Sequence, residues 1–308
     1  MYNSQMNEKF GVIIQGPIIS YGSGGRNDNP EGFDSTDTIK KNIDIISQHI
    51  PTNNIVFSGW STDSEIKTIN IPTVFSKDPY GFDYLNQKRQ FYTIKKGFDY
   101  LSNNNEIQYY VKIRTDQLIP NNFWEWITTS YQKLDNQILV SEFYNNSPFT
   151  VGDFVFSTSK KNFSNFINSQ VLNRHSINGS RNMVFKYLSF DPKNMEFKIS
   201  RNYLLNDLRL VVKFDQVHNY WNEFKHSFFF SIPLEIYKDI EWRGLSMNTR
   251  FENLQQTFTF KATYSEKHTF KSFKTEYGRY ISYTKIYFRK KLKKWLFKIL
   301  FIIQRRSL

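Results

Sequence analysis

The chain has 308 residues, 39% of them hydrophobic and 18% aromatic, with 41 Lys and Arg against 28 Asp and Glu and no cysteine. A chain of this length and apolar content can bury a large core, which excludes a wholly disordered protein. The lack of cysteine excludes disulfides, cysteine-bound zinc, iron–sulfur clusters and thiol catalysis. The first ten residues form no apolar signal-peptide core, so we expect a cytoplasmic protein.

The net charge of +13 is concentrated at the C-terminal end. Residues 279–308 contain ten Lys or Arg and no acidic residue, so residues 1–278 hold 31 basic against 28 acidic side chains, a net of +3. The body of the protein therefore has a nearly balanced surface. The high overall charge does not by itself indicate a nucleic-acid-binding domain.

The first 165 residues alternate between short apolar runs and amphipathic stretches. The runs predict strands at residues 10–18, 55–60, 73–75, 109–116, 137–142 and 153–156. Helical spacing of apolar residues predicts helices at 35–46, 83–101 and 159–167, the first capped by Ser35 or Asp37. Residues 21–34 read as a long loop. This order predicts an α/β fold with a mainly parallel, Rossmann-type sheet flanked by helices.

The pattern is weaker after residue 170. Residues 181–188 and 200–205 favour helices, 208–214 favour a strand, and 232–242 are undecided. Aromatic density stays high there, so we expect this region to belong to the same fold.

Several predicted strands are followed by polar or aromatic side chains. In open α/β sheets, ligands bind beyond the carboxyl ends of the strands, where the strand order reverses. Neither a phosphate-binding glycine loop nor a dinucleotide fingerprint is present. The candidates are therefore the strand-end residues Gln15, Gly16, Gly59, Trp60, Asp63, Arg114, Asp116, Glu142 and Asp153.

The sequence Lys112-Ile-Arg-Thr-Asp116 is the most informative of these strand ends. Asp116 could hold Mg²⁺ or Mn²⁺ on a diphosphate, as strand-end carboxylates do in nucleotide-sugar transferases. The first acid of the usual Asp-X-Asp is replaced by Arg114, whose guanidinium can neutralise a diphosphate itself. A metal is therefore compatible with the motif but not required. A salt bridge at the strand end explains the pattern about as well.

An ordered set of motifs resembles the WavE-type lipopolysaccharide-synthesis family of GT-A-like bacterial glycosyltransferases. The motifs span about residues 10–165: Ile13-Ile-Gln-Gly-Pro17, Ile55-Val-Phe-Ser-Gly-Trp60, Asn86-Gln-Lys-Arg-Gln90 with Thr93 and Gly97, Lys112-Ile-Arg-Thr-Asp116, and Gly152-Asp-Phe-Val-Phe156. The resemblance implies a GT-A-like fold and a role in lipopolysaccharide, O-antigen or capsule synthesis.

The resemblance also implies roles for individual residues. The nucleotide-sugar donor would be bound by Gln15, Gly16, Pro17, Trp60, Asn86, Arg89, Arg114 and Asp116. Asp153 would be the base that deprotonates the acceptor hydroxyl, with Glu142 as the reserve candidate. Four of these residues have a purely structural alternative: Gln15 could cap the sheet edge, Trp60 could be part of the core, Arg89 could lie on a solvated helix face and Asp153 could be a turn residue.

The basic C-terminal segment is amphipathic over residues 280–306. Apolar side chains recur at helical spacing, and basic side chains occupy much of the other side. Nine residues, 295–303, are too few to span a bilayer. We expect a helix lying on an anionic membrane surface, with a helix packed on the domain and a nucleic-acid tail as alternatives. The membrane contacts would come from Arg289, Lys290, Lys293, Lys294, Trp295 and Lys298.

Together these patterns predict an enzyme domain followed by a membrane-associating tail. Residues 1–278 form a glycosyltransferase domain, with a nucleotide-binding half at about 10–165 and an acceptor half at about 166–278, and residues 279–308 form the membrane-associating tail. The enzyme would move a sugar from a nucleotide-sugar donor to a lipid-linked saccharide at the inner face of the cytoplasmic membrane, without nucleic-acid partners. The alternatives are a nucleotidyltransferase on a similar scaffold and a non-catalytic scaffold of the polysaccharide machinery.

Overall fold

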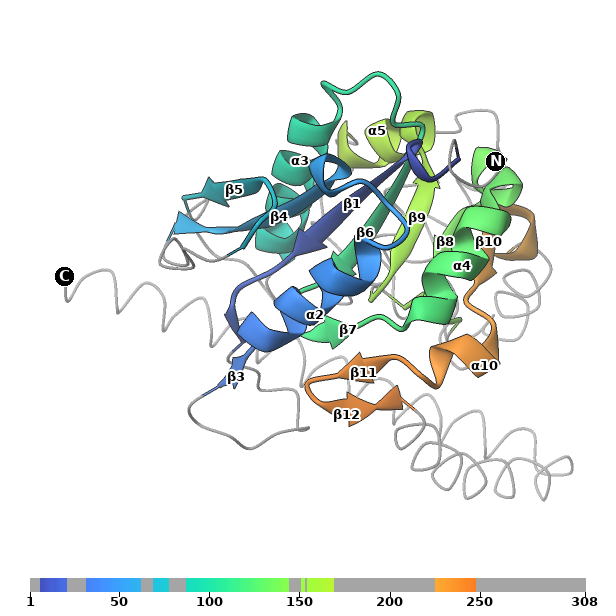
Figure 1. Cartoon of the computed structure of the whole chain (residues 1–308). Helices are drawn as coiled ribbons and strands as arrows, with labels where there is room; N and C mark the ends of the chain where they lie inside the picture. The colour runs from blue at the N-terminus through green and yellow to red at the C-terminus, as the bar shows by residue number, and fades with distance from the viewer. Residues whose placement is uncertain are drawn as a thin grey trace, which may run out of the picture.

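A seven-stranded sheet lies at the centre of the protein in the computed structural model, which describes residues 6–20, 32–61, 69–77, 87–143, 151–152, 154–168 and 225–247 (Figure 1). The strand order is β10-β8-β9-β6-β1-β4-β5. All neighbours pair in parallel except β9, which is antiparallel to both β6 and β8. The strands are β1 (Phe10–Gln15), β4 (Ile55–Trp60), β5 (Thr73–Ser76), β6 (Tyr109–Arg114), β8 (Ile138–Val140), β9 (Phe156–Ser159) and β10 (Phe229–Ser231).

Two small sheets accompany the large one. A three-stranded sheet has the order β12-β11-β7, and it joins the hairpin formed by β11 (Glu241–Trp242) and β12 (Leu245–Ser246) to β7 (Gln117–Leu118). A two-stranded ribbon pairs β2 (Ile19–Ser20) with β3 (Phe33–Asp34). The hairpin thus lies against the segment that directly follows β6.

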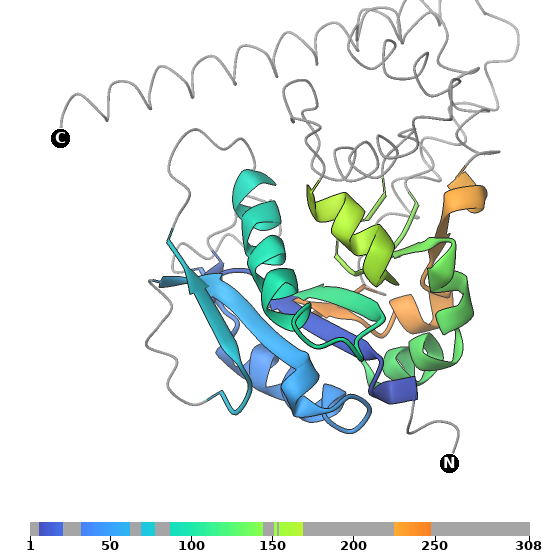
Figure 2. The same cartoon turned by 90° about the horizontal axis from the view of Figure 1, so that it is seen from above.

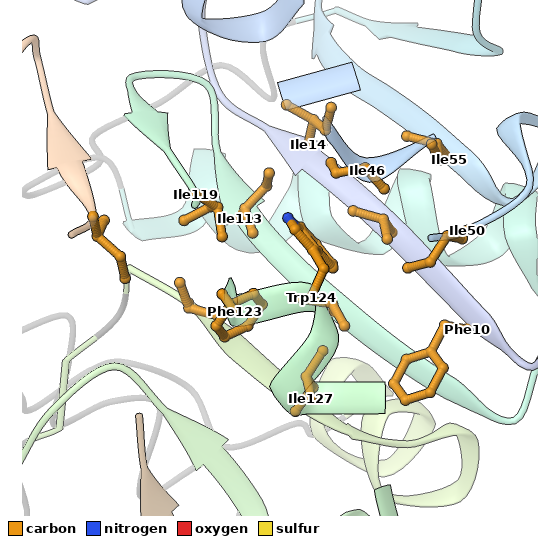
Figure 3. Close-up of a cluster of buried hydrophobic side chains, with 14 of the residues drawn as sticks. Phe10, Ile14, Ile46, Ile50, Ile55, Ile113, Ile119, Phe123, Trp124 and Ile127 are labelled. Carbon is orange, nitrogen blue, oxygen red and sulfur yellow. The ribbon is translucent and has the colours of Figure 1, made fainter. Parts of the chain in front are cut away.

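Helices cover both faces of the large sheet (Figure 2). Buried residues of α2 (Thr36–Ile46) and α4 (Asn121–Thr129) belong to one apolar cluster, and those of α3 (Gln87–Leu101) and α5 (Lys160–Asn168) belong to the other. Shorter helical segments are η1 (Thr52–Asn54), η4 (Tyr131–Asp135) and α10 (Leu234–Tyr237). In Figure 3 the fully buried Trp124 of α4 fills the first cluster beside Phe123 and Ile113. The layers are those of an α/β fold covered on both sides.

The predicted fold class is confirmed, because the sheet is mainly parallel and flanked by helices. The continuous apolar runs of β1, β4 and β6 are buried along nearly their whole length, as interior parallel strands require. Residues 225–247 belong to the same fold, since β10 extends the large sheet. The basic tail at 279–308, and the elements predicted at 181–188, 200–205 and 208–214, lie outside the described residues.

Two local predictions were wrong, and a third was correct only in part. The strand predicted at 153–156 lies at Phe156–Ser159, and residues 33–34, predicted as loop, form β3. Ser35 occupies the predicted N-cap position of α2, but its side chain makes no capping hydrogen bond, and Asp37 lies in the first turn. The side-chain bond at the helix start comes from Asp34 instead, whose Oδ1 accepts hydrogen bonds from the backbone nitrogen and hydroxyl of Thr36 at 2.9 and 2.6 Å. These bonds hold the pKa of Asp34 below its usual value.

Candidate functional site

The carboxyl ends of four strands meet at one edge of the sheet. β1, β4, β6 and β8 all run in the same direction, so Gln15, Trp60 and Arg114 end their strands there, and Glu142 follows β8 at the same edge. The chain passes from β1 to β4 on one side of β1, whereas β6 pairs on the other side. The strand order therefore reverses between β1 and β6, which is where ligands bind in sheets of this kind.

The loops after β1 and β6 are bound to each other at this reversal. Gln15 and Arg114 are paired in register, and the backbone nitrogen of Thr115 donates to the Gln15 carbonyl at 3.1 Å. The Thr115 hydroxyl donates to the Pro17 carbonyl at 2.7 Å. Gly16 has φ +136, and a Cβ there would lie 2.7 Å from the Thr115 hydroxyl oxygen. Glycine is thus required at position 16 by both its backbone conformation and the close approach of Thr115.

Gln15 faces away from this junction, toward α3. Its side chain is buried, and its amide nitrogen donates to the hydroxyl of Thr93 at 2.9 Å. Ser58 of β4 donates to the Thr93 carbonyl at 2.7 Å. Gln15 therefore links β1 to α3 inside the protein. The predicted contacts of Gln15, Gly16 and Pro17 with a nucleotide stay predictions.

Asp116 is the centre of a buried charged cluster just beyond β6. Arg114 donates from Nε to Oδ1 at 2.8 Å and from Nη2 to Oδ2 at 2.9 Å, a bidentate ion pair. Oδ2 also accepts from Trp242 Nε1 and from Arg243 Nε, both at 3.0 Å. The carboxylate is 1% exposed, whereas the side chains of Arg114 and Arg243 are 26% and 10% exposed. Two guanidinium groups surround one carboxylate, so these three side chains, the Arg114–Asp116–Arg243 cluster, carry a net charge of +1 among themselves.

The protonation of Asp116 follows from these contacts. Burial alone would raise the pKa of this carboxyl, but the charge of Arg114 and the hydrogen bonds from Arg114, Arg243 and Trp242 outweigh burial. The pKa is held well below its usual range, and Asp116 is ionised at neutral pH. Asp116 therefore cannot serve as a general acid there.

Trp242 and Arg243 were not among the predicted site residues. They come from the β11–β12 hairpin, whose two turn residues Arg243 and Gly244 have φ +53 and +72. The backbone nitrogen of Arg243 donates to the Asp116 carbonyl at 2.9 Å, beside its side-chain ion pair. The only sequence signal is the pair Arg243-Gly244 just after the undecided region 232–242, which is a weak turn signature.

Aromatic rings enclose the guanidinium groups. The Arg114 Cζ lies 5.7 Å from the Phe154 ring centroid and 6.0 Å from that of Trp242. The Arg243 Cζ lies 5.2 Å from the Trp242 ring centroid, and the rings of Phe154 and Trp242 are themselves 5.2 Å apart. Cation–π contacts of this kind fix the arginines and reduce their access to water.

The described residues do not fit a divalent metal site. Both oxygens of Asp116 already accept charged hydrogen bonds, and two guanidinium groups lie within 3.0 Å of them. Across the described ranges, no three His, Asp or Glu side chains cluster as metal ligands. No step of the reaction is therefore assigned to Mg²⁺ or Mn²⁺. The predicted role of Asp116 in metal binding stays a prediction.

The other predicted residues are placed only in part. Trp60 ends β4 at the same sheet edge, and Arg89 lies near the start of α3; both are partly buried. Glu142 follows β8, and its carbonyl accepts from the Gly152 nitrogen at 2.7 Å. A Cβ on Gly152 would collide with the Ser141 hydroxyl, so glycine permits this close contact. Asn86 and Asp153 lie outside the described residues.

Comparison with known proteins gives structural similarity alone. No family model matches the chain, and no curated protein sequence matches it. A cytidylyltransferase from Leptospira borgpetersenii aligns with 82% of this chain and 96% of its own at 12% identity and a TM-score of 0.39. The 4-diphosphocytidyl-2C-methyl-D-erythritol synthase of Anaerococcus prevotii aligns over 60% and 86% at 10% identity and 0.36. A glycosyltransferase involved in the glycosylation of the major capsid of PBCV-1 aligns with 58% of this chain and 76% of its own at 8% identity and a TM-score of 0.32.

Proposed function

We propose that this protein is a glycosyltransferase that moves a sugar from a nucleotide-sugar donor to a lipid-linked saccharide in bacterial surface polysaccharide synthesis. The observation that carries the proposal is the position of the Arg114–Asp116–Arg243 cluster. A net positive cluster lies beside the strand-order reversal between β1 and β6, where α/β sheets bind their ligands. A donor diphosphate is an anion that such a cluster can bind.

The chemistry requires stabilisation of a leaving group and deprotonation of an acceptor. The acceptor hydroxyl oxygen forms a bond to the anomeric carbon while the bond from that carbon to the diphosphate oxygen breaks, and the electron pair leaves with the nucleoside diphosphate. The guanidinium of Arg114 would stabilise the negative charge that develops there. Glu142, at the same sheet edge, and Asp153 are the candidates for the base that takes the hydroxyl proton.

The proposed acceptor rests on the sequence of the tail. An amphipathic segment with ten basic residues suits a reversible association with anionic lipid, which would bring the domain to a lipid-linked substrate. We propose accordingly that the protein acts at the inner face of the cytoplasmic membrane.

The first experiment is a thermal-stability screen of the full chain against nucleoside diphosphates and nucleotide sugars, each with Mn²⁺ and with EDTA. A ligand that binds only the folded protein raises its melting temperature by mass action. We expect one nucleotide class to stabilise the wild type and to lose this effect in Arg114→Gln. Lys95→Gln, which removes a charge from an exposed helix pair, is the matched control and should keep the effect.

Product analysis then identifies the reaction. Incubation of the stabilising nucleotide sugar with bacterial lipid extract should release the nucleoside diphosphate and leave the sugar on lipid. Release of pyrophosphate from a nucleoside triphosphate and a sugar phosphate would instead establish a nucleotidyltransferase. A folded protein that no nucleotide stabilises would contradict both activities and favour a non-catalytic scaffold.

A further inference from the structure

We infer that Arg114 and Arg243 together form a metal-independent binding site for a phosphate-bearing group, and that Asp116 positions these two arginines rather than coordinating a metal. The identification of the bound group as the diphosphate of the donor rests on the proposed function. The two-arginine site itself does not.

The Asp116 carboxylate is already occupied by hydrogen bonds from its neighbours. It accepts four hydrogen bonds, three of them from guanidinium nitrogens and one from the Trp242 indole, at 2.8 to 3.0 Å. A divalent cation on Asp116 would have to displace at least one arginine and would then lie next to two positive charges. The carboxylate instead fixes the direction of both guanidinium groups.

The Arg114–Asp116–Arg243 cluster keeps a positive charge that can attract an anion. Among these three side chains one carboxylate against two guanidinium groups leaves one positive charge, on arginines that are 26% and 10% exposed and lie beside the rings of Phe154 and Trp242. Electrostatic attraction of an anion is strong in such a place because the effective dielectric constant is lower than in water. Arginine also presents several N–H donors in a fork that matches phosphate oxygens. Arg243 donates to Asp116 from Nε alone, so its two terminal nitrogens make no hydrogen bond to another described residue.

The backbone of the β11–β12 hairpin holds Arg243 in an unusual conformation. Arg243 is the one non-glycine residue with a positive φ in the described part of the chain. Such a conformation is unfavourable for a residue with a Cβ and is retained where surrounding contacts fix it. Here the fixing contacts are the backbone and side-chain bonds to Asp116. An asparagine or glycine would suit the turn better, so the arginine is retained for its side chain.

The experiment is calorimetric titration of the full chain with inorganic pyrophosphate in EDTA. We expect saturable binding by the wild type that weakens at least tenfold in Arg243→Gln and in Arg114→Gln. Lys95→Gln should change the affinity by less than twofold. Asp116→Asn raises the net charge of the cluster, so charge alone would strengthen pyrophosphate binding, whereas the positioning role predicts weaker binding.

Arg243→Lys separates the fork from the charge and protects the test against a folding defect. This variant keeps the charge but loses the Nε donor, and we expect it to melt near the wild type and still bind several-fold more weakly. Pyrophosphate binding that appears only with Mg²⁺ or Mn²⁺, or that Arg243→Gln leaves unchanged, would overturn the inference. Pyrophosphate binding in EDTA without any nucleotide-sugar binding would leave this site standing and overturn the proposed function instead.

Discussion

At the scale of single residues, Asp116 connects stability to pH. Its folded-state pKa lies below the ordinary value of about 4, so its ion pairs stabilise the fold above that pH and are lost as the pH falls through the folded pKa. Removing one partner of a buried ion pair costs about 3 kcal/mol or more. We therefore expect Asp116→Asn to lower the free energy of unfolding by about 3 kcal/mol at pH 7, and the difference from wild type to shrink below about pH 4.

Urea denaturation of both proteins at pH 7, 5 and 3.5 measures this difference. Asp99→Asn is the control, because its ion pair with Lys95 lies on the surface and should contribute less than about 1 kcal/mol at any pH. A difference between wild type and Asp116→Asn that stays constant or grows between pH 5 and 3.5 would show that the Asp116 pKa is not lowered.

At the scale of elements, the contact between α3 and β1 depends on Gly97. A Cβ at this position would lie 2.6 Å from Cγ2 of Ile13 and 3.3 Å from Cβ of Ser58. Alanine in a helix normally gains up to about 1 kcal/mol over glycine, but overpacking a core costs about 1–3 kcal/mol. Because Cγ2 of a β-branched residue in a central strand cannot move away, we expect Gly97→Ala to be destabilising by about 1 kcal/mol.

A double-mutant cycle with Ile13→Ala tests the stated cause. Removal of the Ile13 branches should abolish the penalty, so that Gly97→Ala becomes neutral or stabilising in that background. Equal costs in both backgrounds, measured by chemical denaturation, would show that the close approach to Ile13 is not responsible.

The elements also show what sequence patterns can and cannot predict. β1, β4 and β6 were predictable because their apolar runs are continuous, and the gathering of their carboxyl ends followed from parallel pairing. The start of β9 was placed three residues early because Phe154 and Val155 extend the apolar run into the preceding loop. Two of the partners of Asp116 were not predictable, since Trp242 and Arg243 lie 126 and 127 residues away and reach it through a hairpin with two-residue strands.

At the scale of the whole molecule, charge is distributed unevenly. The net +1 of the Arg114–Asp116–Arg243 cluster is local and enclosed, whereas the ten basic residues of 279–308 are a separate property of the sequence. None of the helices in the described ranges has the length and apolar character needed to cross a bilayer. The proposed membrane association rests on the sequence of the amphipathic tail, and the arginine cluster and the tail can be tested independently.

We expect membrane association and pyrophosphate binding to be independent of each other. Each basic residue near an anionic surface contributes about 1 kcal/mol, so reversing Lys293 and Lys294 to Glu in the full chain changes the attraction by about 4 kcal/mol. In sedimentation with vesicles containing phosphatidylserine, we expect the wild type to bind, less so at high salt, and the double variant to remain in solution. Pyrophosphate affinity in EDTA should be the same for both proteins. A double variant that sediments like wild type would exclude the tail charges as the anchor, and a parallel loss of pyrophosphate binding would show that the tail contributes to the arginine site.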